Sequence, residues 1–302
     1  MLSQDNKITK YFEFFETEFA KDCKFHWDFI SRNKELDKWY FLAKQYDKTK
    51  KINLKKKSER IPKIIHQIWI GPKKLPHKYK GWINSWQLLN PDWDYIFWDN
   101  NRIKELKITD LKVYKESKNY GFKSDLLRYE ILRKYGGLYA DTDFECLQKL
   151  PEYLLNYNFV SSVVFGWEPS INNAIILAKP GVPLLEDLIK NIKSNKNINK
   201  MNVFDASGPF LLTRLYFNLC NDEKNKILIL PSNLFYPFPS FLLETNINIK
   251  NLITKDSIGI HHWERSWFIK PLLIRILIKI ISKMKCIIKN FHKKVQSIFV
   301  IR

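Results

Sequence analysis

The chain has 302 residues, of which 45% are hydrophobic and 15% aromatic, so it can bury a large core and is not a disordered protein. No run of about 18 uncharged apolar residues occurs, which argues against a membrane-spanning helix. The formal net charge of +20 favours an anionic partner, for which nucleic acid, an anionic membrane and an anionic donor are the candidates.

Residues 1–58 mix aromatic and charged side chains as helices do, and they end in a lysine-rich stretch. We interpret them as a helical extension followed by a basic linker, packed on the rest of the chain or on another subunit. The first residues lack a basic segment followed by an apolar run, so no signal peptide is expected. The four cysteines are isolated from one another, which indicates reduced thiols in a cytosolic protein.

Alternating strands and helices come next. Residues 63–70 are a mostly apolar run between Pro62 and Gly71, typical of a central parallel strand. A helix is predicted over 79–89 and a strand over 94–98, and this alternation implies a parallel sheet with right-handed crossovers. Neither a dinucleotide-binding nor a P-loop glycine motif follows these strands, so a phosphate ligand has to be held by a metal and by positive side chains.

A helix and a short strand lead to the part of the sequence that is richest in chemistry. Apolar residues at three-to-four spacing predict the helix over 123–135, with Ser124 placed to cap its start. Gly136 and Gly137 then stop the helix. A buried strand over 138–140 follows and presents the next residues at its carboxyl end.

Asp141 and Asp143 form a D-x-D motif at this strand end. Carboxylate oxygens suit Mg²⁺ or Mn²⁺, and the phosphates of a diphosphate ligand, with water, can complete the metal shell. Both side chains reach the ion if the chain turns there; otherwise one of them acts through water or holds a sugar instead. For so short a motif, a solvated acidic loop is the alternative.

The remaining segments add a polar turn and a histidine pair. Strands are predicted over 160–165 and 174–178, and an apolar helix opens at Pro209. At a strand end, His261 and His262 would point to opposite faces, so that one could bind the metal while the other packs or forms hydrogen bonds. A buried, satisfied histidine pair is the alternative.

Residues 268–302 contain nine Lys and Arg and no acidic residue. Placed at helical spacing, most of the basic side chains gather on one half of the wheel and the apolar ones on the other. This pattern is typical of a basic amphipathic helix that lies on an anionic membrane leaflet. A helix docked on the core with a solvated basic face is the alternative.

Four blocks resemble, in the same order, the motifs of the DXD-containing glycosyltransferases, a family with yeast initiating mannosyltransferases, bacterial capsule transferases and, more distantly, clostridial glucosylating toxins. The blocks are IPKIIHQIWIGP, SWQLLNPDWDYIFWD, SDLLRYEILRKYGGLYADTD and IHHWERSW. The resemblance implies a GT-A-like, Rossmann-like α/β fold over residues 59–267, with a mostly parallel sheet flanked by helices. The helical extension 1–58 and the amphipathic tail 268–302 would lie on either side of it in the sequence.

The resemblance also implies roles for individual residues. The expected metal ligands are Asp141, Asp143 and His261, with His262 as the alternative imidazole. The expected donor-binding residues are Trp69, Asp125, Arg128, Asp141, Asn173, Ser266 and Trp267. The expected catalytic residues are Asp125, Arg128, Tyr139 and Asp141, and the acceptor side is expected to include Ser207 and Gly208.

Several of these residues could equally be structural. Asp125 and Arg128 lie three apart on a helix, so they could contact one donor sugar or diphosphate, or form only an intrahelical salt bridge. Trp69 would stack on uracil or another base, or belong to the core. Tyr139 would lie beside the leaving phosphate or in the core, and Asn173 would face the donor sugar or only shape a turn.

The resemblance implies a metal-dependent, retaining transfer of a hexose from a nucleotide-diphosphate sugar, preferably a UDP-sugar. A lipid-linked or surface-polysaccharide acceptor, as in capsule biosynthesis, fits a cytoplasmic protein attached to the inner face of the membrane, and the Lys-, Asn- and Ile-rich composition hints at a bacterial source. The alternatives are a toxin-like transferase that modifies a protein, and a non-catalytic basic protein. A non-catalytic basic protein would have no use for the D-x-D, Arg128 and histidine motifs, and we therefore expect no nucleic-acid partner.

Overall fold

The structure, a computed structural model, describes residues 36–51, 60–106, 111–165, 169–194, 201–238, 240, 243, 248–264 and 266. The chain divides into two compact units, residues 1–264 and 265–302, and the elements below belong to the first. The predictions for most of the amino-terminal extension, for Trp267 and for the tail 268–302 lie outside the described residues. Within the described ranges, no helix has the length and apolar character needed to cross a bilayer.

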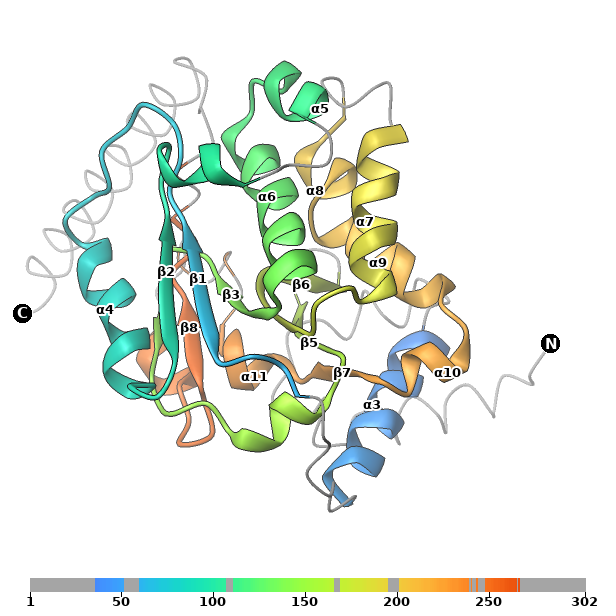
Figure 1. Ribbon diagram of the computed structural model, residues 1–302. Coiled ribbons are helices and arrows are strands. Elements are labelled where there is room, and N and C mark those ends of the chain that lie inside the picture. Colours follow the sequence, from blue (N-terminus) through green and yellow to red (C-terminus); the bar gives the residue numbers. More distant parts are fainter. Residues whose placement is uncertain are drawn as a thin grey trace, which may run out of the picture. The chain divides into compact units, whose positions relative to one another are not determined.

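A six-stranded sheet forms the centre of the first unit, in the order β2-β1-β3-β6-β5-β7 (Figure 1). Its strands are β1 (Ile64–Ile68), β2 (Asp94–Trp98), β3 (Gly137–Ala140), β5 (Phe159–Phe165), β6 (Pro169–Ala178) and β7 (Ile227–Leu230). The pairs β1·β2, β1·β3 and β5·β7 are parallel, whereas β6 is antiparallel to both of its neighbours. The predicted mostly parallel sheet is therefore confirmed, with one reversed strand.

The reversal of β6 follows from its connection to β5. Only residues 166–168 separate the two strands. A parallel pair needs a crossover of about a dozen residues or more, so a link this short forces a hairpin.

Helices pack on and around the sheet (Figure 1). The longer ones are α3 (Leu36–Lys51), α4 (Tyr79–Leu89), α6 (Tyr120–Tyr135), α7 (Pro183–Ser194) and α9 (Pro209–Asn218). Helix α6 packs on β3 and β6 beside α7, α4 packs on β4, and α3 packs on β7. The part of the amino-terminal extension that the structure describes is thus a helix of the first unit, and it buries Trp39 and Leu42 in the core.

Short elements complete the unit. They are η1 (Arg102–Glu105), α5 (Leu111–Glu116), η2 (Glu152–Asn156), α8 (Val203–Ala206), α10 (Asn221–Lys224), α11 (Ser232–Phe235) and η5 (Ile249–Leu252). A second, two-stranded sheet pairs β4 (Phe144–Cys146) with β8 (Gly259–His261) in antiparallel fashion. This pairing brings residues near position 260 beside the D-x-D motif.

The start and end of α6 have clear local causes. The predicted cap at Ser124 is wrong: Asn119 caps the helix, and its side chain accepts hydrogen bonds from the first turn. An Asn side chain outside the helix can reach these amide groups, whereas Ser124 already lies inside it. At the other end Gly136 and Gly137 have φ of 64° and 99°. A Cβ on Gly137 would lie 2.4 Å from the Ile64 carbonyl oxygen, so glycine is required where β3 approaches β1.

Candidate active site

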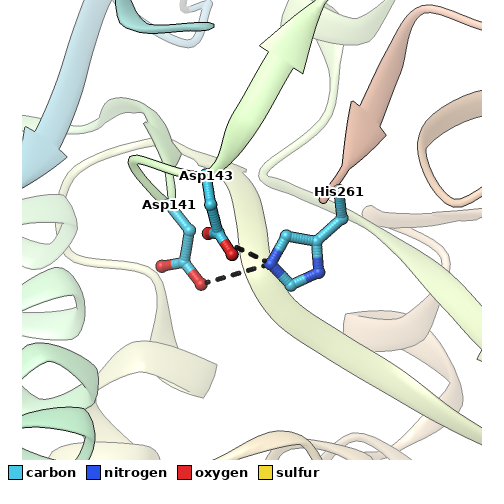
Figure 2. A group of neighbouring side chains, drawn as sticks. All are labelled: Asp141, Asp143 and His261. Atoms are coloured by element: carbon cyan, nitrogen blue, oxygen red, sulfur yellow. Dashed lines mark ion pairs between the residues drawn. The ribbon is translucent and has the colours of Figure 1, made fainter. Parts of the chain in front are cut away.

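Asp141, Asp143 and His261 converge where β3 ends and β4 pairs with β8 (Figure 2). The His261 Nε2 atom lies 3.3 Å from Asp143 Oδ1 and 3.8 Å from Asp141 Oδ2. Neighbouring ligands of one divalent ion, each bound at about 2.1 Å, lie about 3 Å apart. Small side-chain adjustments would therefore suffice for the three residues to hold one ion.

A turn of the backbone lets both carboxylates face the same point. The Phe144 N–H donates to the Asp141 carbonyl at 3.0 Å, and residues 142–143 form the turn between β3 and β4. Of the alternatives left open by the sequence, the structure shows the one in which the chain turns.

The two histidines point in opposite directions, as predicted. His261 faces the carboxylates and is packed against Phe144, with ring centroids 5.3 Å apart. Its Nδ1 atom is buried and has no hydrogen-bond partner among the residues that the structure describes. His262 instead pairs with Glu145 at 2.8 Å and stacks on Trp82. The geometry therefore favours His261 over His262 as the third ligand.

Burial and neighbouring charge set the ionisation of the two carboxylates. Burial raises the pKa of Asp141, and the Arg128 guanidinium only partly offsets this effect. Burial also opposes the ionisation of Asp143, but the His261 ring and the Glu264 N–H outweigh it and hold the pKa of Asp143 below its usual value. The two carboxylates of the motif thus differ in proton affinity, although they lie side by side.

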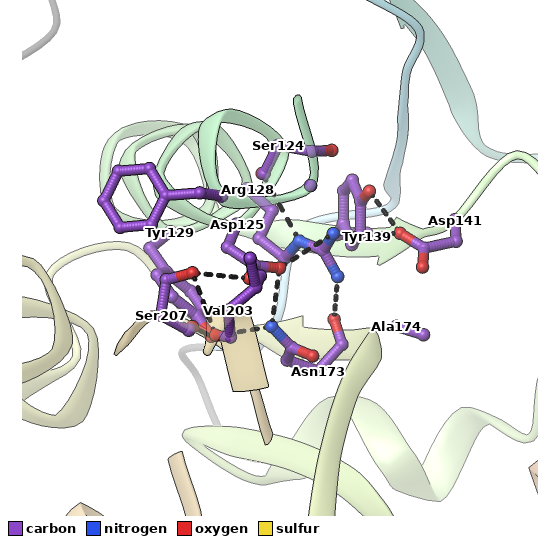
Figure 3. Close-up of polar contacts among 12 residues, drawn as sticks. Ser124, Asp125, Arg128, Tyr129, Tyr139, Asp141, Asn173, Ala174, Val203 and Ser207 are labelled. Carbon is purple, nitrogen blue, oxygen red and sulfur yellow. Dashed lines mark hydrogen bonds and ion pairs between the residues drawn. The ribbon is translucent and has the colours of Figure 1, made fainter. Parts of the chain in front are cut away.

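Arg128 joins α6 to the D-x-D motif (Figure 3). Its Nη2 atom lies 3.1 Å from both Asp125 Oδ1 and Asp141 Oδ1, and its Nη1 atom donates to the Asn173 carbonyl at 2.6 Å. The guanidinium also lies over the Tyr139 ring, 4.4 Å from its centre. The Asp125–Arg128 contact is therefore part of a tertiary network and not only an intrahelical salt bridge.

Asp125 is the buried centre of that network. It accepts hydrogen bonds from Asn173 Nδ2 at 2.8 Å and from Ser207 Oγ at 2.7 Å. Burial raises the pKa of Asp125 to about 6, against the opposing effect of Arg128. Ser207 is fully buried behind Asp125. A Cβ on Gly208 would lie 2.9 Å from Phe204 Cα, so this residue is required for close packing. An acceptor role for either stays a prediction.

Asp141 belongs both to the candidate metal site, which it forms with Asp143 and His261, and to the arginine network around Arg128. Its Oδ1 atom accepts the Tyr139 hydroxyl at 2.6 Å and faces Arg128, while its Oδ2 atom faces His261. A ligand held at the candidate metal site would thus lie next to the arginine network.

The remaining predicted donor residues are placed less completely. Trp69 follows the carboxyl end of β1, is partly exposed, and is fixed by a hydrogen bond from Nε1 to the Lys73 carbonyl at 2.8 Å. Its ring meets Tyr79 edge to face. Ser266 belongs to the second compact unit, and Trp267 lies outside the described residues. Their contacts with a donor stay predictions.

Two buried polar residues of the site were not expected from the sequence. Gln67 donates to the Asp141 carbonyl at 3.1 Å and accepts the Tyr95 hydroxyl at 2.9 Å. Tyr129 donates to the Ser207 carbonyl at 2.7 Å. The signal for Gln67 was available, because a polar residue inside the apolar run of β1 needs a partner when it is buried.

The sequence is similar to glycosyltransferases over part of its length. Residues 76–160 match the family described as glycosyltransferase sugar-binding region containing DXD motif. An uncharacterized glycosyltransferase of Acanthamoeba polyphaga mimivirus is 29% identical over 185 residues, which make up 59% of this chain and 73% of that protein. Inositol phosphoceramide mannosyltransferase 3 of Schizosaccharomyces pombe is 33% identical over 168 residues, which cover 53% of this chain but only 46% of that protein.

Among solved structures, the PaToxG glycosyltransferase superposes on 53% of this chain and 70% of its own, with 20% identity and a TM-score of 0.42. The D-x-D motif, Asp141 and Asp143, lies inside the matched family region. The two sequence relatives described above come from a virus and a yeast. A bacterial source and a capsule pathway stay predictions.

Proposed function

We propose that this chain, which belongs to the DXD-containing glycosyltransferases, moves a hexose from a nucleotide-diphosphate sugar, preferably a UDP-sugar, to a lipid-linked or surface-polysaccharide acceptor. The observation that carries the proposal is the position of Asp141, which faces His261 with one oxygen and Arg128 with the other. This arrangement suits a diphosphate held by a metal on one side and a sugar held by the buried network on the other.

Asp141, Asp143 and His261 would hold the divalent ion. The two carboxylates suit Mg²⁺ and Mn²⁺ alike, whereas imidazole is more often a ligand of transition metals, so the set favours Mn²⁺. When bound, the ion would neutralise the charge that develops on the departing nucleoside diphosphate.

The arginine network would orient the hexose. Arg128 has most of its N–H groups engaged by Asp125, Asp141 and Asn173, so it serves mainly to fix these groups. The Asp125 carboxylate accepts from Asn173 and Ser207, and a carboxylate has lone pairs to spare for a sugar hydroxyl. Because these partners are fixed before the donor arrives, little ordering is left for the reaction itself.

Retention of the anomeric configuration is part of the proposal and follows from the family resemblance. The acceptor would attack the face from which the nucleotide departs, and the leaving phosphate would take the proton of the acceptor. The Tyr139 hydroxyl, held on Asp141, would lie beside that phosphate.

A lipid acceptor is favoured by the relatives. The fission-yeast protein is named an inositol phosphoceramide mannosyltransferase. In this chain, the nine basic and no acidic residues of 268–302 suit attachment to an anionic leaflet. We therefore propose a peripheral protein on the inner face of the membrane, with a protein acceptor as the alternative outcome of acceptor tests.

The proposal is tested by nucleoside diphosphate release from a panel of UDP- and GDP-sugars, with Mn²⁺ or with a chelator. We expect slow hydrolysis of one donor by the full chain, loss of the signal with chelator, and loss in Asp143→Ala. Asp222→Ala, which removes an exposed carboxylate on α10, is the matched control and should retain activity. Failure of every donor to bind or to react in the presence of metal would refute the proposal.

A further inference from the structure

Helix α4 contacts the segment that follows β8 at two points. Lys78, just before the first turn of α4, places its Nζ atom 2.5 Å from Glu264 Oε2. One turn further along, the Trp82 ring stacks on His262 with centroids 3.9 Å apart and planes 12° apart. Residues four apart share one face of a helix, so both contacts come from the same side of α4. We name these four residues the clasp.

The segment that α4 contacts, residues 262–264, also forms hydrogen bonds with Asp143. The Glu264 backbone N–H donates to Asp143 Oδ2 at 2.8 Å, and the His262 N–H donates to the Asp143 carbonyl at 2.9 Å. One carboxylate oxygen is therefore held by the main chain, while the other faces His261. The position of Glu264 consequently determines how Asp143 is presented to an ion.

The turn that brings Glu264 to Asp143 is not intrinsically favoured. Trp263 has a φ of 55°, a conformation that few residues other than glycine adopt. Its ring packs 4.2 Å from the His261 ring, and its Nε1 atom donates to the Phe238 carbonyl at 3.1 Å. Such a backbone persists only where the surrounding contacts hold it, and the clasp supplies contacts on both sides of Trp263.

Solvent exposure indicates what the ion pair does. The Lys78 and Glu264 side chains are 55% and 27% exposed. Exposed ion pairs contribute little to the stability of a folded protein. Loss of the Lys78–Glu264 ion pair should therefore change the position of Asp143 and leave the stability of the fold nearly unchanged.

We propose that Lys78 and Glu264 are positioning residues for the metal cluster: their ion pair fixes the turn at Trp263 and so presets Asp143 for a divalent ion. The proposal rests on the proposed metal site. It assigns α4 a part in metal affinity although α4 provides no ligand.

Calorimetric titration of Mn²⁺ into the full chain tests this, with thermal unfolding measured on the same samples. Lys78→Met and Glu264→Gln should each weaken Mn²⁺ binding about 3- to 5-fold, because a partly exposed ion pair can shift a conformational equilibrium only this far. The unfolding midpoint should shift by no more than about 3 °C. The double exchange Lys78→Glu with Glu264→Lys should restore most of the affinity. Lys80→Met, an exposed neighbour on α4, is the control.

The outcomes separate this inference from the proposed function. If the wild type binds Mn²⁺ and hydrolyses a donor but the single variants bind Mn²⁺ equally well, the positioning role is refuted and the proposed function stands. The same holds if the double exchange fails to restore affinity. It also holds if the single variants lose no more affinity than Lys80→Met does, or if their loss of affinity is accounted for by a loss of thermal stability. If the wild type itself binds no Mn²⁺ and releases no nucleotide, the proposed function fails and the inference with it.

Discussion

His66 on β1 and His261 on β8 are both buried, with exposed fractions of 0% and 8%, yet their ring nitrogens meet opposite conditions. His66 donates from Nε2 to the Gly136 carbonyl at 2.9 Å and accepts the Trp98 indole N–H on Nδ1 at 3.2 Å. His261 faces two carboxylates with Nε2 and has no partner for Nδ1 among the described residues. Burial alone therefore does not single out a candidate metal ligand, whereas incomplete pairing beside two carboxylates does.

The largest effect is expected at His261. Phe in its place keeps the ring packed against Phe144 but removes the ligand nitrogen. Metal-dependent donor hydrolysis should fall about 1000-fold, the upper end for loss of one group that stabilises developing charge. The free energy of unfolding should fall by no more than about 1 kcal/mol, because the loss of the His261–Asp143 contact is partly offset by removal of the unpaired buried Nδ1 atom. Hydrolysis rates and urea denaturation measure the two effects, and retained hydrolysis would remove His261 from the site.

His66→Phe is the matched substitution at the satisfied histidine. It leaves the Gly136 carbonyl and the Trp98 N–H buried without their partner, so the free energy of unfolding should fall by about 2 to 3 kcal/mol. Hydrolysis per folded molecule should change little, because His66 touches none of the candidate ligands. A selective loss of hydrolysis with full stability would contradict the distinction between the two histidines.

The pH dependence of stability sharpens the same comparison. Burial lowers the pKa of His66 to about 4, below its ordinary 6.5. As the pH falls below 6.5, His66 takes up a proton in the unfolded state but not in the folded state. The free energy of unfolding therefore decreases until His66 also protonates in the folded state, near pH 4. The loss amounts to about 3 kcal/mol. Buried Asp125, with its raised pKa, acts in the opposite direction over part of this range.

Subtraction isolates the contribution of His66. The difference in unfolding free energy between the wild type and His66→Phe should shrink by about 3 kcal/mol between pH 7.5 and pH 4, because Asp125 is common to both proteins. Denaturant titrations at a series of pH values measure it. A difference that does not vary with pH would mean that His66 is not held neutral by burial.

The smallest effect is expected at Ser207, a buried residue that donates a hydrogen bond to Asp125. Ser207→Ala removes one hydrogen bond to Asp125 and should cost about 1 kcal/mol of unfolding free energy. The KM for the donor should rise about 5-fold, equivalent to about 1 kcal/mol of binding. Ser194→Ala, on the exposed end of α7, is the control. An unchanged KM would place Asp125 outside the donor site.

Local elements were largely predictable from the sequence. The helix 79–89 and the strand 94–98 have the predicted bounds, and β1, β3 and β5 differ from expectation by one or two residues at their ends. Their apolar spacing and flanking Pro and Gly are local signals. The D-x-D motif and a histidine partner were predicted from the residues themselves, and resemblance to a family added the preference for His261 over His262.

The features that were missed depend on distant contacts. Asn173 meets Asp125 across 48 residues of sequence, Ser207 meets it across 82, and Glu264 meets Asp143 across 121. Gln67 beneath the Asp141 carbonyl belongs to the same class. Spacing along the chain contains no information on such pairs.

The sequence by itself determined the alternation of strands and helices, the carboxylate pair at the end of β3 and the adjacent histidines, because each follows from the chemistry of neighbouring residues. Only the tertiary structure decided that the chain turns between Asp141 and Asp143, and that His261 rather than His262 meets them. It also decided that Arg128 links the two clusters. The physical reason is that hydrogen bonds and ion pairs are short-ranged, so a site exists only once the β4·β8 pairing and the packing of α6 have brought its parts within a few ångströms.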